Sequence, residues 1–133
     1  MNTKRFALSV VAGFVFVFLY ESVIHGMLLM DLYTEFAHLW RSEESMTKMV
    51  PFMSGMQLLF VLALGWIFTR HYENKGIGEG LRFGAYIGFF VGVTMFSFYA
   101  FMPCSMTLAA SWFITTFIEV VALGVIFALI YKE

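Results

Sequence analysis

Four stretches of about twenty mostly apolar residues restrict the folds open to this chain more than any other feature. Each is long enough to cross the hydrocarbon of a bilayer as a helix, and we place them at about residues 6–29, 50–69, 81–102 and 108–131. Helices are expected because lipid offers no partner to unpaired backbone groups. Only 13% of the residues are charged. The sequence therefore predicts an all-α integral membrane protein, a four-transmembrane-helix bundle that forms a single domain over residues 1–133.

The first apolar stretch follows Lys4 and Arg5, as the apolar stretch of a signal peptide would. However, it is longer than the roughly 7–15 residues usual in such a peptide. Glu21 and His25 stand where small residues would mark a cleavage site. We therefore expect a helix that is retained.

The basic residues predict the orientation, because they gather on the cytoplasmic side of membrane proteins. One side of the predicted bundle carries Lys4, Arg5, Arg70, Lys75, Arg82 and Lys132. The other side carries only Arg41 and Lys48. We expect both termini in the cytoplasm, the first and third connections outside, and a bacterial-type inner membrane as the location. The net charge of -1 and the lack of a basic tail give no indication of a nucleic-acid partner.

The first connection, about residues 31–49, is the longest. Its apolar side chains recur at helical spacing at Leu32, Phe36, Leu39 and Trp40. This pattern is typical of an amphipathic helix that lies in the membrane interface.

Two segments of the chain are similar to each other. Ala-Leu-Gly-Trp-Ile-Phe at residues 63–68 and Ala-Leu-Gly-Val-Ile-Phe at residues 122–127 are each followed by a tyrosine, Tyr72 and Tyr131, at the same distance. This similarity predicts two parallel hairpin repeats, with the amphipathic outer segment inserted into the first.

Three glycines, Gly84, Gly88 and Gly92, are spaced by four in the third predicted span. Small residues at this spacing let helix backbones approach closely. The pattern fits either packing inside the bundle or the interface of a homo-oligomer, and it does not distinguish between them.

Polar side chains at membrane depth are costly and indicate function by default. Counting 1.5 Å per residue, Glu21, Gln57 and Glu119 fall in one layer, in the outer half of the bundle, and His25 lies one turn further out. Two interpretations follow. In the structural one, Glu21 pairs with His25, and Glu119 is protonated or bonded to neighbouring polar groups. In the functional one, the two carboxyl groups carry protons or bind a cation.

Soft ligands are concentrated near the predicted outer face. Thioether and thiol groups favour monovalent copper, and the candidate ligands are His38, Met49, Met53, Met102, Cys104 and Met106. Met49-x-x-x-Met53 and Gly84-x-x-x-Gly88 are similar, by analogy only, to features of eukaryotic-type copper transporters, which have three spans per subunit. The alternative is that these methionines fill gaps in helix packing. Haem is disfavoured, because two imidazoles would have to face each other at one depth.

These patterns lead to three hypotheses. The first is handling or transport of a cation, a metal such as Cu(I), or protons through the polar layer. The second is a non-catalytic accessory subunit of a larger membrane complex. An enzyme is the least favoured, because no nucleophile with its base stands out in the sequence.

Overall fold

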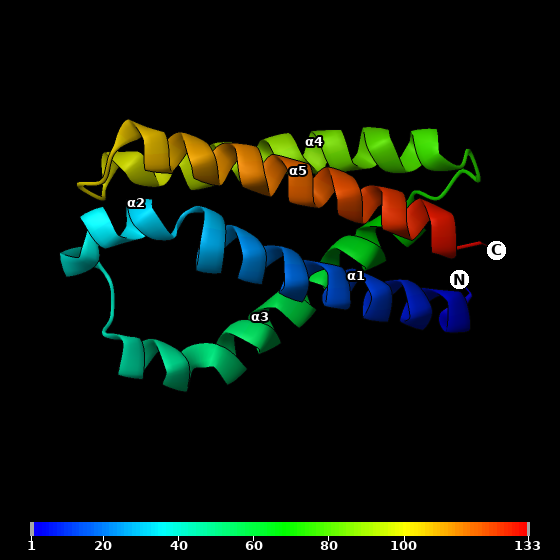
Figure 1. Cartoon of the computed structure of the whole chain (residues 1–133). Coiled ribbons are helices and arrows are strands. Elements are labelled where there is room, and N and C mark those ends of the chain that lie inside the picture. Colours follow the sequence, from blue (N-terminus) through cyan, green and yellow to red (C-terminus); the bar gives the residue numbers. More distant parts are fainter. Residues whose placement is uncertain (1, 133) are drawn as a thin grey trace.

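The computed structural model describes residues 2–132, and these residues form one helical bundle (Figure 1). In chain order the elements are α1 (Thr3–Val23), the π-helical segment η1 (Ile24–Leu28), α2 (Met30–Glu35), the 3-10 turn η2 (Ala37–Leu39), α3 (Glu43–Arg70), α4 (Ile77–Ser97), the 3-10 turn η3 (Phe98–Ala100) and α5 (Met106–Ile130). Four stretches are long and apolar enough to cross a membrane, namely Thr3–Leu28, Glu43–Arg70, Ile77–Ala100 and Met106–Ile130. The predicted all-α, four-span membrane fold is confirmed.

The bundle has two distinct ends (Figure 1). One, the terminal end, carries both ends of the described chain and the connection between α3 and α4. The other, the α2 end, carries α2, η2 and the connection before α5. At the terminal end the backbone N–H of Asn2 donates to the hydroxyl of Tyr131 over 3.3 Å, and the Asn2 amide donates to the carbonyl of Lys132 over 3.1 Å. Cytoplasmic exposure of the terminal end stays a prediction.

Helices α4 and α5 pack closely because glycines line one face of α4. A Cβ atom on Gly80 would lie 2.2 Å from the carbonyl oxygen of Gly124, and one on Gly84 would lie 2.5 Å from the Cα of Val121. Only hydrogen fits at these positions. Gly88 and Gly92, further along the same face, are also buried against α5. The glycine row therefore lies inside the chain, at the α4–α5 contact.

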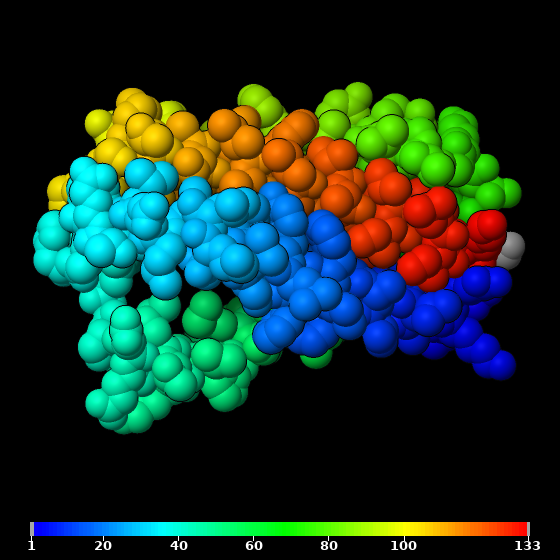
Figure 2. Space-filling model, viewed as in Figure 1, coloured from blue at the N-terminus to red at the C-terminus, as the bar shows by residue number. Residues whose placement is uncertain are grey.

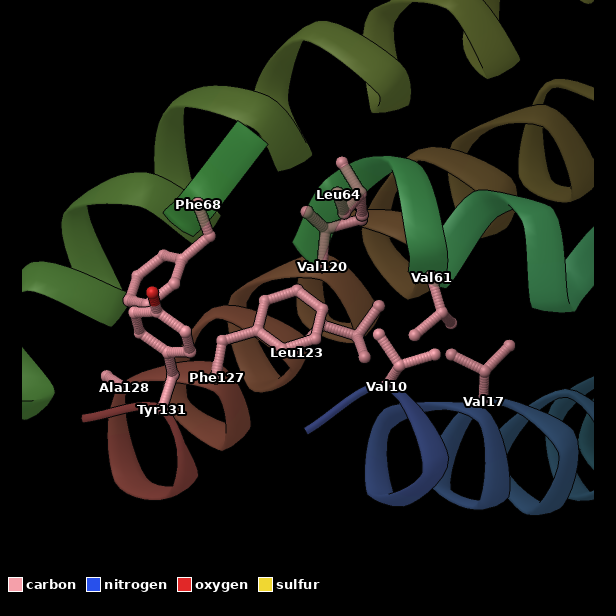
Figure 3. Packing of buried hydrophobic residues seen from close by; sticks show 10 residues of the cluster. All are labelled: Val10, Val17, Val61, Leu64, Phe68, Val120, Leu123, Phe127, Ala128 and Tyr131. Carbon is pink, nitrogen blue, oxygen red and sulfur yellow. The ribbon is translucent and has the colours of Figure 1, made fainter. Parts of the chain in front are cut away.

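The apolar core lies where α1, α3 and α5 meet (Figure 3). It occupies the half of the bundle nearer the terminal end. It consists of Val10, Val17, Val61, Leu64, Phe68, Val120, Leu123, Phe127, Ala128 and Tyr131. Gly13 lets α1 approach this core, because a Cβ there would lie 2.9 Å from Val61 and 3.0 Å from Leu123. The core separates the terminal end from the polar residues described below.

Helix α3 begins at Glu43, not near residue 50 as predicted. Ser42 caps it by accepting the backbone N–H of Ser45 over 3.3 Å, and Glu43 and Glu44 give the first turn the negative charge that the helix dipole favours. Pro51 therefore lies inside the helix and not in its first turn. The hydropathy pattern missed this start because these first turns are polar.

The first half of α3 stands away from the rest of the bundle. Figures 1 and 2 show it diverging from α1, with a gap between it and the α2 region. Large apolar side chains there are exposed, namely Met46, Val50, Phe52, Met53 and Met56. Helices α1 and α3 thus pack together mainly in the half of the bundle that holds the core.

The predicted amphipathic outer segment, residues 31–49, consists of several short pieces. Residues Met30–Glu35 form α2, Ala37–Leu39 form a 3-10 turn, and Glu43 onward belongs to α3. The segment after α1 bends towards α5, because the π-helical residues Ile24–Leu28 interrupt the regular α-helix. This bend brings two aromatic residues, Tyr33 and Trp40, against α5, as shown by their contacts with Trp112.

The connection between α3 and α4 is held by Glu79. This buried carboxylate accepts the backbone N–H groups of Glu73 and Lys75, over 2.7 and 2.8 Å. A small pocket of about 220 Å³ lies beside it at the terminal end. Because Glu79 is already bonded to its own loop, we assign it a structural role.

Candidate functional site

Glu21 and His25 form a hydrogen-bonded pair where α1 passes into the π-helical segment. They are four residues apart, which places them on one face of the helix. The Nε2 atom of His25 lies 3.1 Å from an Oε2 atom of Glu21, and the two side chains are 34% and 30% exposed. Both are thus partly shielded and partly accessible.

Glu119 brings a second carboxyl group to this pair from α5. It is 5% exposed, and its side chain lies within hydrogen-bonding reach of that of Glu21. An ionised carboxylate only accepts hydrogen bonds. A hydrogen bond between two carboxyl groups therefore requires a proton on one of them, so this pair is able to share a proton.

Tyr20 links α1 to α5 by a hydrogen bond at the depth of the two carboxyl groups. Its hydroxyl donates to the backbone carbonyl of Thr115 over 2.8 Å. This bond fixes the two helices one residue away from Glu21 and one turn from Glu119. The two carboxyl groups are thereby held facing each other.

The other ring nitrogen of His25 continues the chain of hydrogen bonds towards α2. Nδ1 of His25 lies 2.6 Å from the hydroxyl of Tyr33. That hydroxyl also accepts the indole N–H of Trp112 over 2.8 Å. Since Trp112 only donates, the hydroxyl proton of Tyr33 is free to be donated to Nδ1, and in that tautomer the Nε2–H of His25 points to Glu21. In this arrangement the carboxylate of Glu21 accepts the hydrogen bond from His25.

Burial of Tyr33 raises the pKa of its hydroxyl, whereas the hydrogen bond from Trp112 acts in the opposite direction. The phenol therefore keeps its proton over the physiological pH range. It serves as a hydrogen-bonding link in the chain and carries no charge there.

Trp40 completes an aromatic wall on the same side. Its indole N–H donates to the backbone carbonyl of Tyr33 over 3.0 Å, and its ring meets that of Trp112 edge-on, with centroids 6.3 Å apart. Both indole rings are therefore held in place through Tyr33.

A pocket of about 350 Å³ adjoins this polar chain. Its lining consists of Glu21, His25, Trp40, Met95, Phe98, Met102, Trp112 and Thr116. The wall is mostly aromatic and thioether, with one carboxylate. It includes no lysine or arginine, so its electrostatic character is neutral to negative.

The structure brings together three of the four predicted polar-layer residues, Glu21, His25 and Glu119. Gln57 is partly buried on α3, and within residues 2–132 it makes no hydrogen bond to the carboxyl pair. The reason is that α1 contacts α5 at this level, whereas the first half of α3 diverges from both.

The predicted copper ligands are dispersed. Met49 and Met53 lie on the diverging half of α3, whereas Cys104 is buried in the connection before α5. Met106 and His38 are exposed at the start of α5 and on η2. Only Met102 reaches the pocket. Among residues 2–132 no three His, Cys, Asp or Glu side chains are grouped as metal ligands.

Sequence reasoning missed Tyr33, Trp40 and Trp112 as parts of the site. One signal was available for Trp112, which precedes Glu119 by two helical turns and so lies on the same face of α5. For Tyr33 there was none, because its place depends on the irregular turn after α1.

Comparison with known proteins adds no relative: no protein-family model, curated protein or solved structure matches the chain. The function is therefore argued from the site alone.

Proposed function

We propose that this membrane protein takes up and releases protons at the Glu21–Glu119 pair and exchanges them with the α2 end through His25 and Tyr33. The continuous hydrogen-bonded chain from Glu119 through Glu21 and His25 to Tyr33 carries this proposal. Each member both holds a proton and contacts the next, which is the requirement for a proton relay.

The position of the apolar core supports access from one end only. Val17 lies one turn before Glu21, and Val120 directly follows Glu119; both are almost fully buried. The core lies between the carboxyl pair and the terminal end. Protons therefore reach the pair from the α2 end in this conformation, and passage to the other side would need a second conformation.

The test is to titrate the carboxyl pair in lipid. Infrared difference spectra between acidic and alkaline buffer, recorded on the purified protein in phosphatidylcholine bilayers, should contain a protonated-carboxyl band. Glu119→Gln and Glu21→Gln should each remove or shift that band, because each replaces one carboxyl by an amide of the same shape. Glu35→Gln is the matched control, since Glu35 is an exposed carboxylate at the same end, outside the site.

A second measurement tests exchange directly. In vesicles with a pH-sensitive dye inside, an imposed membrane potential should drive proton entry through the wild-type protein, and Glu21→Gln should abolish it. His25→Phe should slow it, because the ring nitrogens that link Glu21 to Tyr33 are then gone. Unchanged infrared spectra and unchanged proton entry in both carboxyl variants would overturn the proposal.

A second candidate function is that of an accessory subunit in a larger membrane complex. It is favoured by the diverging first half of α3, whose large apolar side chains are exposed in the described chain. Purification from native membranes in a mild detergent distinguishes the two. A stable larger complex that dissociates in Phe52→Ala would support the subunit role, and a chain that purifies alone would contradict it.

A further inference from the structure

The pocket beside Glu21 combines three features. It has one carboxylate, two indole rings held edge-on to each other, and no positively charged lysine or arginine in its lining. Its volume of about 350 Å³ falls at the small end of the range for ligand sites. We propose that it binds a compact organic cation, a quaternary or apolar ammonium group.

The indole rings provide the first part of the recognition. The faces of tryptophan rings attract cations, and an ammonium group surrounded by carbon is easily freed of water. Trp40 and Trp112 are both fixed through hydrogen bonds from their indole N–H groups to Tyr33. Because those N–H groups are already occupied, the rings offer apolar π surface to a ligand and not hydrogen-bond donors.

The charge provides the second part. Glu21 is the single carboxylate in the lining, and it is partly exposed, so a cation can approach it directly. A hard inorganic cation such as Mg²⁺ or Ca²⁺ would need several oxygen ligands, which the lining does not offer: besides Glu21, its side chains bring one hydroxyl, that of Thr116, with thioethers and rings. An organic cation, which needs one counter-charge and apolar contact, fits this composition better.

This inference rests on the proposed function, because the cation and the protons would share Glu21. The titratable groups that face this carboxylate are Tyr20 and His25 on its own side, Tyr33 from α2 and Glu119 from α5. Protonation of His25 or of the carboxyl pair makes the pocket more positive. Cation affinity should therefore fall as the pH falls, and cation binding should release protons.

The experiment uses benzyltrimethylammonium as the probe and the protein in phosphatidylcholine nanodiscs. The chain has three tryptophans, and Trp66 lies at the other end of the bundle beside Arg70. In a Trp66→Phe background the fluorescence therefore reports on Trp40 and Trp112. The probe should change it in a saturable way, and its neutral isostere neopentylbenzene should not.

Variants separate charge from aromatic contact. Glu21→Gln should weaken probe binding by about tenfold or more, the loss of one charge interaction, whereas Glu35→Gln should leave it unchanged. Trp40→Leu should weaken binding several-fold, and Trp40→Phe should retain most of it, because phenylalanine keeps an aromatic face. Equal affinity in the wild type and Glu21→Gln, or an equal response to the neutral isostere, would overturn the inference.

The two proposals fail in distinguishable ways. A carboxyl titration seen in the infrared, without saturable probe binding, would overturn the cation-binding inference and leave the proposed proton site standing. Charge-dependent probe binding without any titration of the carboxyl pair would overturn the proton relay. The pocket would then bind cations independently of pH, and the shared use of Glu21 by protons and cation would also be wrong.

Discussion

The hydroxyl of Tyr33 lies 2.6 Å from Nδ1 of His25, across the irregular turn that separates α1 from α2. Tyr33 also accepts the indole N–H of Trp112 from α5. The phenol of Tyr33 on α2 therefore links the π-helical segment η1 to α5. This bond determines both the direction of the His25 ring and the position of the aromatic wall.

Tyr33→Phe should destabilise the α2 end. It removes the partner of both His25 and Trp112, and hydrogen bonds within membrane proteins are worth about 0.6–2 kcal/mol each. Unfolding by dodecyl sulfate measures the loss. Tyr86→Phe is the control, because Tyr86 is 75% exposed on α4 and should show no change. Equal stability of the two variants would mean that the Tyr33 hydroxyl does not stabilise the α2 end.

Gly84→Ala should strongly weaken the bundle. The new Cβ would meet the backbone of Val121 at 2.5 Å, so α4 and α5 must separate, and overpacking of this kind costs about 1–3 kcal/mol. Gly55→Ala has the opposite expectation: nothing lies within 4 Å of a Cβ there, and alanine favours a helix by about 1 kcal/mol over glycine. Thermal unfolding of both variants measures the contrast, and a loss of stability in Gly55→Ala would contradict it.

Glu73 should titrate at a lower pH than an ordinary glutamate. Its pKa is lowered, first by the hydrogen bond from Lys75, whose Nζ lies 2.6 Å from Oε2, and to a lesser degree by Arg82. The depressed pKa stabilises the loop at neutral pH, and this contribution is lost as the pH falls through that pKa. Carboxyl NMR titration should show the pKa rising in Lys75→Gln. Lys48→Gln, which breaks a separate ion pair with Glu44, should leave it unchanged.

The predicted orientation can be tested with single cysteines. In a Cys104→Ala background, an impermeant maleimide added to intact cells should label Glu44→Cys at the α2 end and not Glu73→Cys at the terminal end. The reason is the concentration of lysine and arginine around the terminal end. The reverse labelling pattern would mean that the terminal end faces outward, and the proton relay would then open to the cytoplasm.

The four spans and the carboxyl pair followed from the sequence for one physical reason. Lipid tolerates neither unpaired backbone nor unpaired charge, so apolar runs and rare acids such as Glu21 and Glu119 stand out in a single chain. Their depth along each helix follows from the helical rise. The contact between them agrees with that count.

The remainder of the site depends on features that leave little trace in a sequence. The π-helical residues Ile24–Leu28 change the helical register, and that change places Tyr33 over His25. The hydropathy pattern also did not predict the start of α3, because that start is determined by the Ser42 cap and the acidic first turn. Similarity between the repeats is consistent with the structure at one point: Gly65 packs against α1 and Gly124 against α4, so both lie where the second helix of a hairpin meets its first. The duplication itself stays a prediction.

The hydrogen bonds from Asn2 to Tyr131 and Lys132 have a consequence for engineering. Residues at the two ends of the described chain are close enough for a few glycines to join them. A circular permutant opened at the exposed residues between α3 and α4 would then begin with α4 and end with α3, with every span retained. The order in which helices enter the membrane would change, while the contacts of the finished bundle would stay the same.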